Sequence, residues 1–269
     1  MADIEITREG ATAVLTMNRP DQRNALDYGM REAFAAAVAE VRDDASVRAV
    51  VLTGAGGHFC AGGDVKILAE MQGRKTDVME GRERIRKLHR WFDELVDLEK
   101  PVIAAVDGVV FGAGLSLALS ADFVLATPRA KFCAVFTRLG FVPDMGAMYL
   151  LPRVVGLQMA KELVFTGRVV GVDEARQIGL VHSVVSTDLQ AAALEFAARF
   201  HSAPTATLGM AKSVMNHAFE SSRNDVYAQE AMAQALARET DFHGEAVRRF
   251  LAKEAPLYQW PEPGAGTST

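Results

Sequence analysis

The sequence predicts an α/β fold followed by a region built from helices alone. Short apolar runs typical of strands, such as 47–52 and 102–106, alternate with segments whose apolar residues recur at helical spacing. After about residue 200 only helical patterns remain, and they are rich in Ala, Met and Leu. Glycine-rich turns follow two of the strands. The glycine fingerprint of a dinucleotide-binding fold is missing after the first strand, which argues against that fold. We expect a core over 1–200, a helical oligomerisation region over 201–258 and a disordered tail over 259–269.

The N-terminal elements are expected to be a hairpin, a loop and a helix. Segments 4–8 and 11–18 alternate apolar and polar residues about Glu9-Gly10, which predicts a β-hairpin. A polar loop over 19–24 follows, and Asp27 suits the N-cap of the next helix. The apolar stripe of that helix comprises Met30, Phe34, Val38 and Val41.

The next elements follow from the same periodicities. Strands are predicted at 47–53, 102–107, 123–126 and about 132–135. Helices are predicted at 64–71, around the apolar stripe 85–96, between the strand 102–107 and Ser120, and at 204–220, 225–239 and 244–253. A polar break is expected at 72–77.

Composition and charge narrow the class of protein. The chain has 269 residues, 49% of them hydrophobic, which is enough for a large buried core. Its formal net charge of -5 supplies no global attraction for nucleic acid or an anionic membrane. The N-terminus resembles no export signal, and the uncharged stretch 108–121 is too short to span a bilayer. We therefore expect a cytoplasmic protein that binds neither nucleic acid nor membrane.

The cysteines do not indicate a metal or a disulfide. Cys60 and Cys133 are the only two, and neither has a second cysteine or histidine partners at metal-ligand spacing, although His58 is near Cys60. We interpret both as reduced, small apolar residues and expect no metal.

Two glycine-rich turns carry the strongest functional signal. They are His58-Phe59-Cys60-Ala61-Gly62-Gly63-Asp64 and Gly108-Val109-Val110-Phe111-Gly112-Ala113-Gly114, and each follows a strand and opens a helix. Small residues leave backbone N–H groups uncovered, and two such groups aimed at one oxygen form an oxyanion hole. Either turn alone is better explained by a tight bend or by close helix packing, and only the two turns together favour an oxyanion hole.

The ordered motifs add a family resemblance. Asn18-Arg19-Pro20, Arg23-Asn24-Ala25-Leu26, the two glycine turns, Ala121-Asp122 and Gly171-Val172-Asp173-Glu174-Ala175 resemble the crotonase, or enoyl-CoA hydratase/isomerase, superfamily across nearly the whole chain. The resemblance implies a spiral of ββα units, a C-terminal helical trimerisation region, and a homotrimer or dimer of trimers. It also implies an acyl-CoA thioester substrate and no cofactor other than the coenzyme A carried by that substrate.

The resemblance also implies site residues. The amides that hold the thioester oxygen fall on Gly63 and Ala113. The residues implied to contact coenzyme A are Arg23, Ala25, Leu26, Ala61, Asp64, Val65 and Lys66, with Phe250 and Lys253 reaching the coenzyme A of an adjacent subunit.

The positions of the acidic residues indicate the reaction. Hydratases of the superfamily use two glutamates, and the matching positions here are Ser116 and Phe136. A single acid follows in Pro143-Asp144-Met145-Gly146, a placement that resembles the ring-1,2-epoxyphenylacetyl-CoA isomerases and related Δ3,Δ2-enoyl-CoA isomerases. There the aspartate shuttles a proton. Apolar neighbours are expected to raise the pKa of Asp144, namely Phe136, Phe141, Val142, Met145 and Met148, of which Phe136, Met145 and Met148 form the predicted acyl pocket.

Other interpretations remain. Asp144 also suits a helix N-cap, and a weak hydratase or a non-catalytic trimer binding a CoA ester or RNA are alternatives to an isomerase. Ser116 lacks the partners of a nucleophile and is expected to pack within a helix. His58, Asp64, Asp107 and Asp122 are expected to be structural, with Asp64 capping the helix after the first turn.

Overall fold

The computed structural model describes residues 2–72 and 77–261, and its strands form two sheets. The larger sheet has the order β1 (Ile4–Glu9), β2 (Thr12–Met17), β3 (Ala49–Gly54), β4 (Val102–Val106), β6 (Phe123–Ala126) and β9 (Ser183–Val184). The smaller sheet has the order β5 (Val109–Phe111), β7 (Lys131–Cys133) and β8 (Val169–Gly171). β1 and β2 form the predicted antiparallel hairpin, and every other pairing in the larger sheet is parallel.

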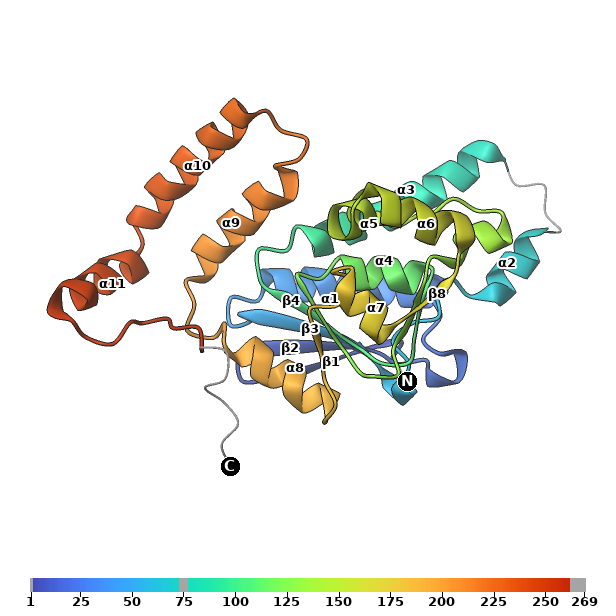
Figure 1. Ribbon diagram of the computed structural model, residues 1–269, viewed down its shortest axis with the longest axis horizontal. Coiled ribbons are helices and arrows are strands. Elements are labelled where there is room, and N and C mark those ends of the chain that lie inside the picture. Colours follow the sequence, from blue (N-terminus) through green and yellow to red (C-terminus); the bar gives the residue numbers. More distant parts are fainter. Residues whose placement is uncertain (1, 73–76, 262–269) are drawn as a thin grey trace.

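The helices flank these sheets (Figure 1). They are α1 (Tyr28–Asp43), α2 (Val65–Gln72), α3 (Val78–Val96), α4 (Ala113–Leu119), α5 (Ala147–Val155), α6 (Leu157–Thr166), α7 (Val172–Gln177), α8 (Leu189–Ala198), α9 (Thr205–His217), α10 (Arg223–Arg238) and α11 (Asp241–Ala252). Across 2–72 and 77–261, no helix combines the length and apolarity needed to cross a bilayer.

Strands β4 to β7 alternate between the two sheets, as expected for the spiral of ββα units. β4 lies in the larger sheet and β5 in the smaller one, and the pair β6 and β7 repeats this step before α5. Cys60, after β3, bridges Val110 of β5 in the same way. The unit is therefore a strand in each sheet followed by helix.

Several element boundaries differ from the sequence prediction. The second glycine turn contains a strand, β5, because Val109–Phe111 pairs with both Cys60 and β7. The strand expected near 132–135 ends at Cys133, and Val135–Leu139 forms a 3-10 helix. Of the polar break predicted at 72–77, residues 73–76 lie outside the described residues.

The larger sheet separates two apolar cores because its side chains alternate between its faces. On one face Leu15, Val50 and Leu52 join the core formed with α1, α3 and α4. On the other face Val14, Val51 and Ile103 pack against α8, which lies across the sheet from α3 and α4 (Figure 1). The larger core supports the elements that carry the glycine turns.

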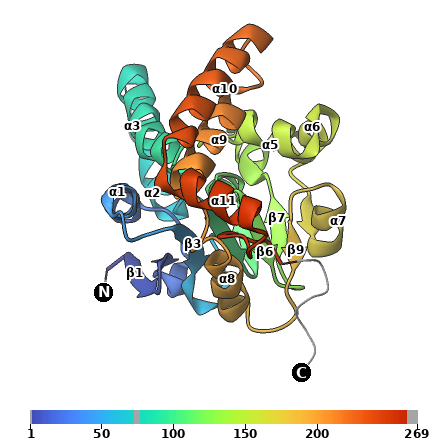
Figure 2. The same cartoon turned by 90° about the vertical axis from the view of Figure 1, so that its left-hand side faces the viewer.

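α9, α10 and α11 form an arm at one end of the molecule (Figure 1), the end that faces the viewer in Figure 2. α10 and α11 contribute no buried residue. Their exposed large apolar side chains are Tyr227, Met232, Leu236, Val247, Phe250 and Leu251. The last part of the chain returns to the core, where the ring of Trp260 lies 5.6 Å from Phe196 and 5.2 Å from Phe200; residues 262–269 lie outside the described part of the chain.

An ion pair attaches this arm to the sheet. Lys212 of α9 is buried, and its ammonium lies 3.0 Å from the carboxylate of Asp122, which also accepts a hydrogen bond from the Val102 amide at 2.7 Å. α9 runs so close to the core that a Cβ on Gly209 would lie 2.6 Å from that of Glu99. The structural role expected for Asp122 is thereby confirmed.

We expect Asp122→Ala to lower the free energy of unfolding by about 2–4 kcal/mol, because it leaves the Lys212 ammonium without its counter-ion and the Val102 amide without an acceptor. Urea denaturation at neutral pH measures the loss. The exposed pair Glu195 and Arg199, at 3.3 Å, supplies the control, and Glu195→Ala should cost less than about 1 kcal/mol. Equal losses in the two variants would contradict this role.

Candidate active site

The first glycine turn is held against the segment that precedes α1. The Leu26 amide donates to Gly62 O at 2.7 Å and the Asp64 amide donates to Leu26 O at 3.2 Å. In such a parallel bridge the amide of the intervening residue, Gly63, points away from its partner strand. Within the described residues the Gly63 amide has no hydrogen-bond partner, and a Cβ built on Gly63 would meet nothing within 4 Å. The turn therefore presents one free N–H to open space.

Asn24 anchors the segment before α1 to the first glycine turn through side-chain hydrogen bonds. It is fully buried, its side-chain amide donates to Ala55 O at 2.9 Å and His58 O at 2.7 Å, and its oxygen accepts from the Arg19 amide. Arg23 and Asn24 both adopt left-handed backbone conformations, which turn the chain sharply before α1. Nothing in the sequence analysis had marked Asn24 as a structural anchor.

The second glycine turn packs directly on the first. The Phe111 amide donates to Cys60 O at 3.0 Å, and a Cβ on Gly62 would lie 3.5 Å from the Ala113 amide nitrogen. A Cβ on Gly114 would lie 2.3 Å from Cys60 O, so only glycine permits this approach. Ala113 is the first residue of α4, and over the described chain its amide donates to no acceptor. The structure thus brings two unpaired amides, Gly63 and Ala113, onto adjoining turns.

Asp144 lies in the loop before α5 and is held through its backbone. The Ser116 hydroxyl, on α4, donates to Asp144 O at 3.0 Å. Met145 is buried in a left-handed conformation with φ of 46°, which is strained for a residue other than glycine. Gly146, at φ of 69°, is the N-cap of α5, and a Cβ there would lie 2.8 Å from the Phe92 ring. The interpretation of Asp144 as an N-cap is therefore wrong.

The Asp144 carboxyl is a perturbed acid. Burial raises its pKa, and the neighbouring basic groups of Arg31, His89 and Arg84 oppose that rise. Its Oδ1 atom is buried and has no hydrogen-bond partner among the described residues. A carboxyl group with a raised pKa and a free oxygen is suited to accept and release a proton.

The surroundings of Asp144 differ from those predicted. Met145 and Phe136 are buried, but Phe141, Val142 and Met148 are 52, 74 and 62% exposed and do not enclose the carboxyl within this chain. Met148 lies on the outer face of α5, whereas Ala147 and Leu151 pack inward. The sequence analysis missed the basic side chains from α1 and α3, because only tertiary packing brings them to this loop.

The residues expected to contact coenzyme A divide into two groups. Arg23, Ala25, Leu26, Ala61, Asp64, Val65 and Lys66 lie together on the two paired segments of the first turn, with Val65 and Lys66 exposed. Phe250 and Lys253, at the end of α11, lie at the opposite end of the molecule from α2 (Figure 1). Phe250 is 82% exposed. One chain therefore does not bring these two residues to the glycine turns.

The remaining polar residues of the turns have structural contacts. One oxygen of Asp64 accepts the Lys66 amide at 3.0 Å, which is the expected cap of α2, and the other pairs with Arg19 at 3.1 Å. His58 accepts the Val109 amide at 3.3 Å, and Asp107 accepts Thr127 and Gly108.

The two cysteines are buried, as predicted, and burial raises the pKa of the Cys60 thiol to about 12. At neutral pH this thiol is protonated and a poor nucleophile.

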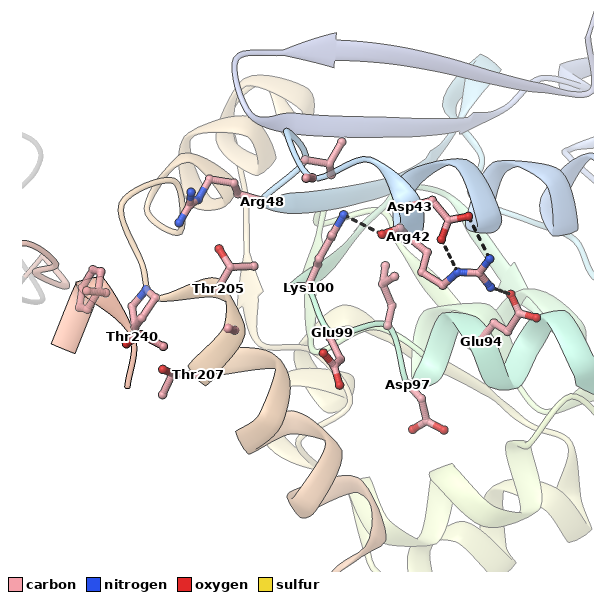
Figure 3. A pocket seen from close by; sticks show the side chains of 16 residues that line it. Arg42, Asp43, Arg48, Glu94, Asp97, Glu99, Lys100, Thr205, Thr207 and Thr240 are labelled. Atoms are coloured by element: carbon pink, nitrogen blue, oxygen red, sulfur yellow. Dashed lines mark hydrogen bonds and ion pairs between the residues drawn. The ribbon is translucent and has the colours of Figure 1, made fainter. Parts of the chain in front are cut away.

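A large cavity lies away from these turns, between the core and the arm (Figure 3). It has a volume of about 840 Å³ and is lined by residues of different elements, among them Arg42, Glu94, Lys100 and Thr205. Its charges are largely paired: Arg42 contacts Asp43 and Glu94, and Lys100 donates to backbone carbonyls at the end of α1. None of the residues proposed for the site lines this cavity.

The spiral fold and the adjoining amide-bearing turns define a protein of the crotonase fold. The chain matches the Enoyl-CoA hydratase/isomerase family over residues 7–261 and belongs to that enzyme family. It is 35% identical to the 1,2-epoxyphenylacetyl-CoA isomerase of Escherichia coli K12 over 93% of this chain and 95% of that protein. It is also 35% identical to the short-chain-enoyl-CoA hydratase of Clostridium acetobutylicum, with the same coverage. A solved enoyl-CoA hydratase/isomerase from Cupriavidus metallidurans CH34 superimposes with a TM-score of 0.92 at 36% identity, covering 98% of this chain and 99% of that one.

Proposed function

We propose that the protein is an enoyl-CoA isomerase in which Asp144 moves a proton and the amides of Gly63 and Ala113 hold the thioester oxygen. The observation that carries the proposal is the Asp144 carboxyl, with its raised pKa and unpartnered Oδ1, in a site where Ser116 and Phe136 replace the two hydratase glutamates. Two carboxylates position and split water, whereas a double-bond shift needs one proton carrier.

The reaction balances with this single acid. Ionised Asp144 takes a proton from C2 of a 3-enoyl thioester, and the electron pair delocalises through the thioester carbonyl and the double bond. The negative charge on the oxygen is stabilised by the two amides, which act most strongly when that charge develops. Protonated Asp144 then returns the proton at C4, which yields the 2-enoyl thioester and restores the carboxylate.

The test compares two assays on the purified protein. With a 3-enoyl-CoA, we expect the ultraviolet absorbance of the conjugated 2-enoyl thioester to appear. With crotonyl-CoA, loss of that absorbance would report hydration, and we expect it to be much slower. Hydration that outpaces isomerisation would favour a hydratase, and binding without either reaction would favour a non-catalytic protein.

The raised pKa of Asp144 predicts the pH dependence of isomerisation. The proposed base must be ionised, so kcat/KM should fall as pH decreases through the pKa of the free enzyme. Because burial raises that pKa, this decline should occur above the pH at which an exposed aspartate titrates. A pH profile of kcat/KM checks this, with far-ultraviolet circular dichroism at each pH to confirm folding. Activity that stays constant down to the range of an exposed aspartate would contradict it.

We also propose that a second copy of the chain covers the arm. α10 and α11 expose a large apolar surface, of the kind that marks an interface. In such an assembly Phe250 and Lys253 would act on the coenzyme A of a neighbouring subunit, since they lie far from the turns of their own chain.

A further inference from the structure

Arg31 and Asp144 each present a buried polar atom without a partner. These atoms are Nε of Arg31 and Oδ1 of Asp144, and neither has a hydrogen bond among the described residues. The charge of Arg31 nevertheless acts on Asp144 more strongly than any other charge, so the two groups share one environment. Buried polar atoms in folded proteins are nearly always paired, which makes two unpaired atoms in one environment a sign of a missing occupant.

Packing holds the two groups apart while keeping them in that environment. α1 and α3 are fixed to each other by the stacked rings of Phe34 and Trp91, 5.1 Å apart, and the Asp144 loop rests against Phe92 of α3 through Gly146. Arg31 lies one turn before Phe34 on α1. No ion pair within 4.0 Å joins Arg31 to Asp144 over the described residues. A guanidinium whose task was only to neutralise Asp144 would bond to it directly and satisfy both atoms.

The other charges near Arg31 do not supply the missing partner. Asp27 pairs with Arg19 at 3.0 Å and caps α1 through the Met30 amide. The Tyr28 ring lies 5.5 Å from the Arg31 guanidinium and offers only its face. On the α3 side, Arg84 and His89 are basic and, like Arg31, lower the pKa of Asp144. Each of these basic groups would attract an oxygen acceptor.

We propose that Arg31 is a specificity-determining residue that binds an acceptor oxygen on the acyl group, with a carboxylate as its strongest ligand. The inference rests on the proposed function, because the role of Asp144 as base places C2 to C4 of the acyl chain beside Asp144. The first carbon beyond that reacting segment is C5, so a carboxylate at C5 is the ligand we assign to Arg31. The favoured substrates are accordingly CoA thioesters whose acyl chain carries an oxygen just past the shifting double bond.

Binding of saturated thioesters tests this without any turnover. Glutaryl-CoA and pentanoyl-CoA share a five-carbon chain and differ only in the terminal carboxylate or methyl group. Isothermal titration calorimetry should show tighter binding of glutaryl-CoA to the unmodified protein. Arg31→Met should weaken glutaryl-CoA binding by about 10- to 100-fold, the range of a hydrogen bond to a charged group, and should change pentanoyl-CoA binding by less than about two-fold.

Two further variants complete the design. Arg31→Lys keeps the charge without the planar fork and should weaken glutaryl-CoA binding to an intermediate degree. Arg90→Met removes an arginine on α3 that is 68% exposed and pairs with Glu83, and it should change neither affinity. Equal weakening of both thioesters by Arg31→Met, or no preference for glutaryl-CoA in the unmodified protein, would overturn the proposal. If binding behaves as expected but no 3-enoyl-CoA is isomerised, the assignment of Arg31 stands and the proposed reaction falls.

Discussion

Replacing Asp144 by asparagine should lower kcat for 3-enoyl-CoA isomerisation by about 10²- to 10⁴-fold, the contribution of a positioned acid–base group. The amide has nearly the shape of the carboxyl but cannot accept the proton from C2. Affinity for a saturated acyl-CoA should change little, since the two turns that hold the thioester do not depend on this side chain. Steady-state kinetics and calorimetry on the same preparations measure the two quantities separately.

The control for this variant is a second aspartate with a raised pKa. Asp93, on the exposed side of α3, has its pKa raised by partial burial and is not among the charges acting on Asp144. Asp93→Asn should therefore retain activity. If Asp144→Asn also retains activity, while remaining folded, the proton must be carried by another group and the proposed mechanism is wrong.

The positions of the glycine turns could be predicted because the glycines themselves mark them in the sequence. A Cβ at Gly114 would collide with the Cys60 carbonyl, and a Cβ at Gly62 would lie 2.8 Å from Phe111 O. Glycine at these positions is thus a direct record of two backbones in close approach. The strand β5 was missed because three residues carry too little periodicity, and no residue type in it marks its pairing with Cys60.

The role of Asp144 as the proton carrier was inferred because the two hydratase glutamates are missing from this sequence. The side chains that surround Asp144 were not predictable. The sequence showed that positions 116 and 136 lack carboxylates, but it gave no sign that Ser116 donates to the backbone of Asp144. Arg31 and His89 are more than fifty residues from Asp144 and reach it only when α1 and α3 pack together. The sequence therefore favoured an apolar shell, and the structure shows instead a buried carboxyl opposed by basic side chains.

The second large effect is expected from Ala113→Pro, which removes one of the two amide donors. Ala113 is the first residue of α4, where proline is tolerated because its nitrogen need not donate within the helix. The variant should therefore fold, while losing a donor of a kind that contributes about 10²- to 10³-fold to kcat. Ala113→Gly keeps the amide and is the matched control, which should stay within about ten-fold of the unmodified protein, allowing for a more flexible helix start. Isomerisation kinetics on both variants, with circular dichroism and acyl-CoA binding as checks on folding, separate loss of the donor from loss of structure. A folded Ala113→Pro enzyme with normal kcat would mean that the Ala113 amide does not stabilise the thioester oxygen, because proline has no N–H to donate.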